Sequence, residues 1–132
     1  AQLQDVDTSF FFLKDYELSF DYYAPVIITN NKLLQTNPEL VKKTLAAMKQ
    51  GYIYAANNPE EGAEILVKHA PETNKELALA SQKYISTQYL DEEGDWGKFD
   101  YARWDRFYDW VYKNGLLEKP LPPQAGVSND YL

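Results

Sequence analysis

The chain has 132 residues, no cysteine, and 20 acidic against 13 basic side chains, which gives a formal net charge of −7. This length suits one domain with a buried core, and the absence of cysteine excludes disulfides, iron–sulfur clusters and thiol catalysis. The acidic balance argues against a nucleic-acid partner, because phosphate binding needs clustered Lys and Arg.

No apolar run in the sequence approaches the roughly 20 residues that span a bilayer. The chain opens abruptly at Ala1, without an initiator Met or a recognisable leader. We therefore expect it to be a fragment of a longer protein.

Two short segments near the N-terminus have the composition of buried strands. Residues 8–13 are mostly β-branched or aromatic, and residues 25–29 place Val26, Ile27 and Ile28 after a proline. Because an isolated two-stranded ribbon is only marginally stable in water, both strands need a sheet partner. Between them, residues 15–23 are acidic and aromatic with no clear period, a composition that often faces ligands.

Helical signals begin at Asn31 and continue to about residue 118. After a short turn, Asn37 followed by Pro38 predicts a helix start. Asn58 followed by Pro59 predicts a second start, and Glu61 stands where it would complete a capping box. A further helix is expected after Thr73 or Asn74, and the solvated turn of residues 91–95 follows it.

The last predicted helix is unusually aromatic. Asp100 is the expected N-cap, and Gly115 is suited to the left-handed conformation that ends a helix. One face repeats every three or four residues through Trp104, Phe107, Tyr108 and Val111. This pattern predicts a docking helix, and the prolines of residues 119–132 predict an extended tail.

Residues typical of catalytic or metal sites are scarce. His69 is the single histidine and is expected to interact with the last carbonyls of its helix. The acidic residues 91–95 lack the spacing of a calcium loop, and no Gly-rich phosphate loop or nucleophile elbow occurs. The three tryptophans are interpreted as packing residues. We expect no catalytic residue, no metal and no cofactor.

Nine segments, taken in chain order, resemble one protein family. They are Lys14-Asp15-Tyr16, Asp21-Tyr22-Tyr23-Ala24-Pro25-Val26-Ile27-Ile28-Thr29-Asn30, Asn37-Pro38-Glu39-Leu40-Val41-Lys42-Lys43, Gly51-Tyr52, Asn58-Pro59-Glu60-Glu61, Ala80-Ser81-Gln82, Trp96-Gly97, Ala102-Arg103-Trp104 and Ser128-Asn129-Asp130-Tyr131-Leu132. Together they resemble the C-terminal part of the thiamine-pyrimidine-precursor-binding family. This family comprises solute-binding proteins of ABC importers and the related fungal pyrimidine synthases.

The resemblance implies an α/β fold, the C-terminal portion of a type II periplasmic-binding-protein fold. That portion would be mostly helical, with about five helices and two strands that need a sheet partner. It would form one partial domain over residues 1–132: cleft and hinge strands with the aromatic loop at 1–30, a helical region at 31–118, and the tail at 119–132. The N-terminal portion of the family has no counterpart in this sequence.

The resemblance also implies a function. The chain would be part of an extracytoplasmic solute-binding protein, periplasmic or lipid-anchored, that delivers a thiamine pyrimidine precursor to an ABC permease. The expected ligand-binding residues, which supply aromatic faces and carboxylates to an aminopyrimidine, are Asp15, Tyr16, Asp21, Tyr22 and Tyr23. Expected partners are the aminopyrimidine, the permease, and a missing N-terminal lobe or second chain that completes the sheet.

Two alternatives stay open. One is a fragment of a pyrimidine synthase of thiamine biosynthesis, although the His and Lys that the resemblance implies for that chemistry would lie in the N-terminal half of the family. The other is a self-assembling helical interaction module, whose strand edges would pair with another copy or a partner.

Overall fold

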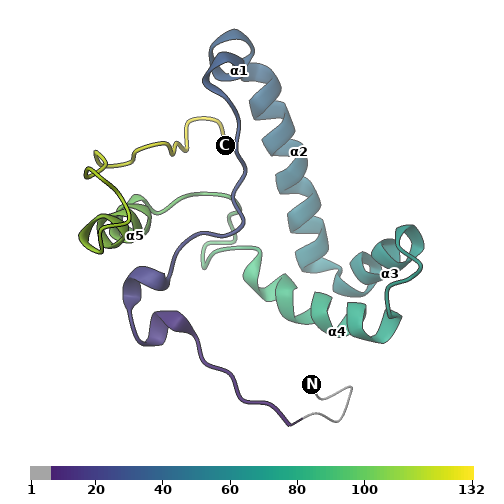
Figure 1. The fold of residues 1–132 in the computed structure, drawn as a ribbon. Helices are drawn as coiled ribbons and strands as arrows, with labels where there is room; N and C mark the ends of the chain where they lie inside the picture. Colours follow the sequence, from purple (N-terminus) through teal and green to yellow (C-terminus); the bar gives the residue numbers. More distant parts are fainter. Residues whose placement is uncertain (1–6) are drawn as a thin grey trace. The chain divides into compact units, whose positions relative to one another are not determined.

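The computed structural model describes residues 7–132, which form two compact units. One unit contains α2, α3 and α4 and runs from Asn37 to Lys98, with Leu132. The other joins the N-terminal stretch up to Thr36 with Phe99–Tyr131 and contains α1 and α5 (Figure 1). The prediction of a mostly helical chain with about five helices is confirmed for the described residues.

The two predicted strands do not form within residues 7–132. Residues 8–12 are irregular and Leu13 begins the short 3-10 helix η2 (Leu13–Asp15), while residues 25–29 have no regular structure. A strand is defined by a hydrogen-bonded neighbour, and the described residues supply none to either segment. Phe10 and Ile28 are consequently 82% and 85% exposed.

The first unit is built from three helices, α2 (Pro38–Asn57), α3 (Pro59–His69) and α4 (Lys75–Ile85), of which α2 and α4 have a side-chain cap. The side-chain oxygen of Asn37 accepts from the Leu40 N–H, and that of Asn74 accepts from the Leu77 N–H at 2.9 Å. Both asparagines thus satisfy donors that a helix start leaves free, as the sequence predicts.

The capping box predicted at Asn58 does not form. The Asn58 side chain instead donates to the carbonyl of Tyr54 at 2.9 Å, and the Glu61 carboxylate accepts the Tyr54 hydroxyl. Because α2 continues to Asn57, Asn58 ends one helix and begins the next. Its side chain is engaged by a carbonyl of α2, the helix that ends there, and does not cap α3.

Small residues let α3 pack closely on α4. Ala63 and Ala78 are the buried positions of these two helices. Ser86, the first residue of η4 (Ser86–Gln88), donates to the carbonyl of Ala55 at 3.1 Å and so ties the pair to α2. Trp96 is also buried and stacks on Tyr52 with ring centroids 4.9 Å apart.

The second unit contains the short α1 (Asn31–Thr36) and the aromatic α5 (Tyr101–Lys113). The Asp100 carboxylate caps α5 by accepting from the Ala102 N–H at 2.9 Å, and Gly115 follows the helix with φ 74°. Both predicted boundary signals are confirmed. No helix in the described part of the chain has the length and apolarity needed to cross a membrane.

The C-terminal tail is held on α5 by bonds between side chains and backbone. The Trp104 indole N–H donates to the Ala125 carbonyl at 3.1 Å, and the Asp105 carboxylate accepts from the Gln124 N–H at 2.7 Å. Just before the helix, the Asn129 amide both accepts from the Phe99 N–H at 2.9 Å and donates to the Phe99 carbonyl at 3.0 Å.

Two glycines should respond oppositely to alanine. Gly51 lies inside α2 and a Cβ there would meet nothing within 4 Å, so Gly51→Ala should raise the free energy of unfolding by about 1 kcal/mol. Gly115 has φ +74°, so Gly115→Ala should lower it by about 1–2 kcal/mol. Urea denaturation of both variants is the test, and a change of the same sign in both would contradict this interpretation of the backbone.

The Lys49–Asp95 contact predicts a pH effect. The Lys49 ammonium donates to Asp95 at 2.6 Å and lowers the pKa of that carboxyl below its ordinary value of 3.8, so the pair stabilises the fold at neutral pH and loses this effect as pH falls. Lys49→Met should raise the Asp95 pKa toward 3.8, measured by NMR titration. Lys98→Met is the matched control and should raise it less, because Lys98 acts on Asp95 through the weaker charge effect alone. An unchanged Asp95 midpoint in Lys49→Met would contradict the prediction.

Candidate functional site

The segment around residues 18–26 lies against α5 through aromatic rings. Phe20, at the end of the 3-10 helix η3 (Leu18–Phe20), contacts Trp110 with ring centroids 4.7 Å apart. Tyr22 stacks on Phe107 at 4.6 Å with the two ring planes only 26° apart. Since Phe107 and Trp110 are three residues apart on one helix, successive rings of the segment meet successive rings of α5.

Polar contacts fasten the same segment to the first turn of α5. The Arg103 guanidinium donates to both the carbonyl and the carboxylate of Asp21, at 2.8 and 2.9 Å, and lies 4.3 Å from the Tyr23 ring centroid. The Tyr23 hydroxyl accepts from the Asp100 N–H at 2.7 Å. An irregular segment is therefore held by ion-pair, cation–π and hydrogen-bond contacts at once.

The structure brings together three of the five predicted ligand residues. Asp21, Tyr22 and Tyr23 all contact α5. Asp15 and Tyr16 lie at the end of η2 and are exposed; Tyr16 is 79% exposed and meets only the edge of Phe11 among aromatic partners. The predicted cluster is thus divided into a docked part and an exposed part.

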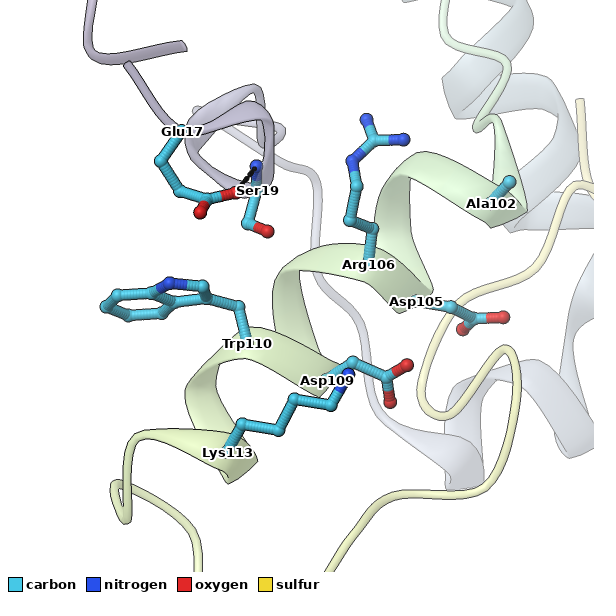
Figure 2. Close-up of a pocket in the computed structure, with 8 residues that line it drawn as sticks. All are labelled: Glu17, Ser19, Ala102, Asp105, Arg106, Asp109, Trp110 and Lys113. Atoms are coloured by element: carbon cyan, nitrogen blue, oxygen red, sulfur yellow. Dashed lines mark hydrogen bonds between the residues drawn. The ribbon is translucent and has the colours of Figure 1, made fainter.

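Two hollows lie beside this segment. A small one of about 70 Å³ is lined by Tyr22, Tyr23, Val26, Trp104, Phe107 and Tyr108. A larger, open one of about 480 Å³ is lined by Glu17, Ser19, Ala102, Asp105, Arg106, Asp109, Trp110 and Lys113 (Figure 2). The first has aromatic walls, and the second carries charges of both signs.

In the larger hollow, Glu17 and Ser19 face Arg106 and Trp110 across the opening (Figure 2). The Glu17 carboxylate accepts the Ser19 N–H at 2.9 Å, and this bond lowers the pKa of Glu17. The Arg106 Nε is buried, and none of residues 7–132 accepts its hydrogen. Such a buried donor without a protein acceptor is uncommon.

Sequence reasoning missed Arg103 as a site residue. Arg103 lies 82 positions from Asp21 in the sequence, and local periodicity carries no information on contacts between residues so far apart. The available signal was a lone cation in the first turn of an aromatic helix, one turn before Phe107. Opposite charges at Asp21 and Arg103 were visible, but nothing local paired them.

The described residues hold no group of three His, Cys, Asp or Glu side chains placed to bind a metal ion. In the acidic turn, the Asp91 carboxylate accepts from the Glu93 and Asp95 N–H groups at 3.0 and 2.7 Å. Asp91 therefore caps its own turn, as its sequence pattern indicates. His69, the single histidine, is the last residue of α3.

Comparison with known proteins identifies related sequences. The family described as "NMT1/THI5 like" matches residues 1–62. A formylaminopyrimidine-binding protein of Halalkalibacterium halodurans is 24% identical over 127 residues, which cover 93% of this chain. The resemblance predicted from the sequence is confirmed.

A riboflavin-binding protein, RibY, of Chloroflexus aurantiacus is also similar, with 26% identity over 119 residues and 86% of this chain covered. The matched regions make up 38% and 34% of these two proteins. The chain thus spans little more than a third of the length of the curated relatives it matches. These two relatives are named as small-molecule-binding proteins.

Replacing one hydroxyl tests how the segment is held. Tyr23→Phe removes the acceptor for the Asp100 N–H and should lower the free energy of unfolding by about 1 kcal/mol. Tyr22→Phe is the matched control, because the contact of Tyr22 with α5 is ring stacking on Phe107, which phenylalanine keeps. Denaturation curves that show equal losses in both variants would contradict a specific role for the Tyr23 hydroxyl.

Proposed function

We propose that the chain is part of an extracytoplasmic solute-binding protein of an ABC importer and that it contributes to binding a thiamine pyrimidine precursor. The proposal is carried by the similarity to a formylaminopyrimidine-binding protein across 93% of this chain. The proposed ligands are hydroxymethylpyrimidine or formylaminopyrimidine. Riboflavin, the ligand named for the other relative, shares with them a flat ring system rich in nitrogen.

The docked residues have the chemistry that such a ligand needs. Tyr22 uses ring surface on Phe107 yet stays 43% exposed, which leaves aromatic surface for a second ring. One Asp21 carboxylate oxygen accepts from Arg103, and a carboxylate has two oxygens with about four acceptor positions. Asp21 therefore retains capacity to accept from a ligand amino group.

The remaining predicted ligand residues suit a contribution from the other side of a cleft. Asp15 and Tyr16 offer a carboxylate and an exposed ring without being held by α5. Residues 8–13 and 25–29 would become strands when the rest of the protein supplies their sheet partners. In this proposal residues 1–30 form cleft and hinge, and the later helices give support.

The mechanism requires no covalent chemistry, so we propose a binding protein and not an enzyme. Ligand would make contacts available only when two lobes close, and this differential affinity shifts the hinge equilibrium. The permease would then recognise the closed form. The residues of this chain would bind and orient the ring, and no proton needs to be transferred.

Calorimetry tests the proposal on the gene product that contains this sequence. Hydroxymethylpyrimidine and formylaminopyrimidine should each release or absorb heat and raise the melting temperature, because a ligand at 100 times its Kd stabilises by about 2.7 kcal/mol. Riboflavin should be titrated in parallel to establish which ring is preferred.

A variant pair locates the site within this chain. Tyr22→Ala should weaken binding by about 2- to 10-fold through loss of stacking. Tyr84→Ala, which removes an exposed tyrosine of α4 in the other unit, should leave the affinity unchanged. Absence of heat and of a thermal shift with all three ligands would contradict the proposal, and conversion of a substrate to a pyrimidine product would favour the synthase alternative.

A further inference from the structure

We infer that Arg103 is a positioning residue for the proposed ligand site, fixing the orientation of Tyr22 by holding the residues on either side of it. This inference rests on the proposed function. It adds that affinity depends on a side chain of α5 that is not itself among the expected ligand contacts.

The contacts of Arg103 are directed at both neighbours of Tyr22. Its Nε donates to the Asp21 carbonyl at 2.8 Å and its Nη2 to the Asp21 carboxylate at 2.9 Å. The guanidinium carbon lies 4.3 Å from the Tyr23 ring centroid. Arginine alone has a planar fork that can donate twice to one residue and also stack on a ring.

This ion pair is better protected from water than the other four in the described chain. The side chains of Arg103 and Asp21 are 30% and 28% exposed, whereas every other ion pair has both partners at 38% or more. Lower exposure reduces screening, so the pair restrains geometry more than an exposed pair does.

Helix geometry connects the Arg103–Asp21 contacts to the ring of Tyr22, which is proposed to face the ligand. Arg103 and Phe107 are four residues apart and so lie on one face of α5. Arg103 fixes the backbone at Asp21 while Phe107 stacks on Tyr22, which sets both the position and the plane of that ring. A ring held in its binding orientation before ligand arrives avoids the cost of ordering it on binding.

The test compares ligand affinity across variants, by calorimetry with hydroxymethylpyrimidine and well below each melting temperature. Arg103→Met should weaken binding about tenfold. Arg103→Lys keeps the charge and loses the fork, so its affinity should fall between wild type and Arg103→Met. Lys83→Met is the control: it removes the exposed Lys83–Glu60 ion pair in the other unit and should leave affinity unchanged.

A readout without ligand separates positioning from general stability. Amide hydrogen exchange at residues 21–24 should speed up in Arg103→Met while α2 keeps its protection. Wild-type affinity in Arg103→Met, within about twofold, would overturn the inference. If Arg103→Met does not fold, Arg103→Lys decides: wild-type affinity there, within about twofold, overturns the inference, and weaker binding supports it.

The two proposals fail in different ways. A wild-type protein that binds none of the pyrimidines overturns the proposed function and the inference with it. A wild-type protein that binds, with Arg103→Met and Arg103→Lys binding equally well, overturns the inference and leaves the proposed function standing.

Discussion

Aromatic packing on α5 is the interaction on which the order of its unit depends. Within this unit, residues 7–30 and the tail after α5 have little regular structure, so neither stretch can order itself through backbone ladders. Rings of the preceding segment meet Phe107 and Trp110, and the tail is bonded to Trp104. The polar contacts of Arg103 with Asp21 then stabilise one of the arrangements of the segment that ring packing alone would allow. The candidate site exists because the helix is both aromatic and charged in its first turn.

The same unit leaves much apolar surface uncovered. No large side chain among residues 7–132 is fully buried, and Phe10, Phe11, Ile27 and Ile28 are each at least half exposed. A chain of this length normally buries, on folding, about two-thirds of the surface that its unfolded form exposes. These four residues fall in the two segments predicted as strands, which is where the proposed solute-binding protein needs a sheet partner. This agreement supports the proposal from a side independent of the sequence similarity.

Local signals in the sequence predicted the helices well, because caps and periodicity act within a few residues. Asn37, Asn74, Asp100 and Gly115 mark helix boundaries as expected. The prediction of a capping box at Asn58 was wrong, because the helix that ends there and the helix that begins there compete for the Asn58 side chain. The site was predicted less completely. The segment was recognised from its acidic and aromatic composition, but its division into docked and exposed residues depends on Arg103, which lies 82 positions from Asp21 in sequence.

The paired bonds of Asn129 to Phe99 resemble one rung of a β-ladder, with a side-chain amide in place of a neighbouring strand. Only a group that donates and accepts at once can make both bonds, so aspartate, which lacks the donor, is no substitute. The positions of this tail should therefore differ in how freely their residues change among related sequences. The position bound only through its own backbone carbonyl, Ala125, is free to change its side chain among related sequences, whereas position 129 is expected to stay asparagine.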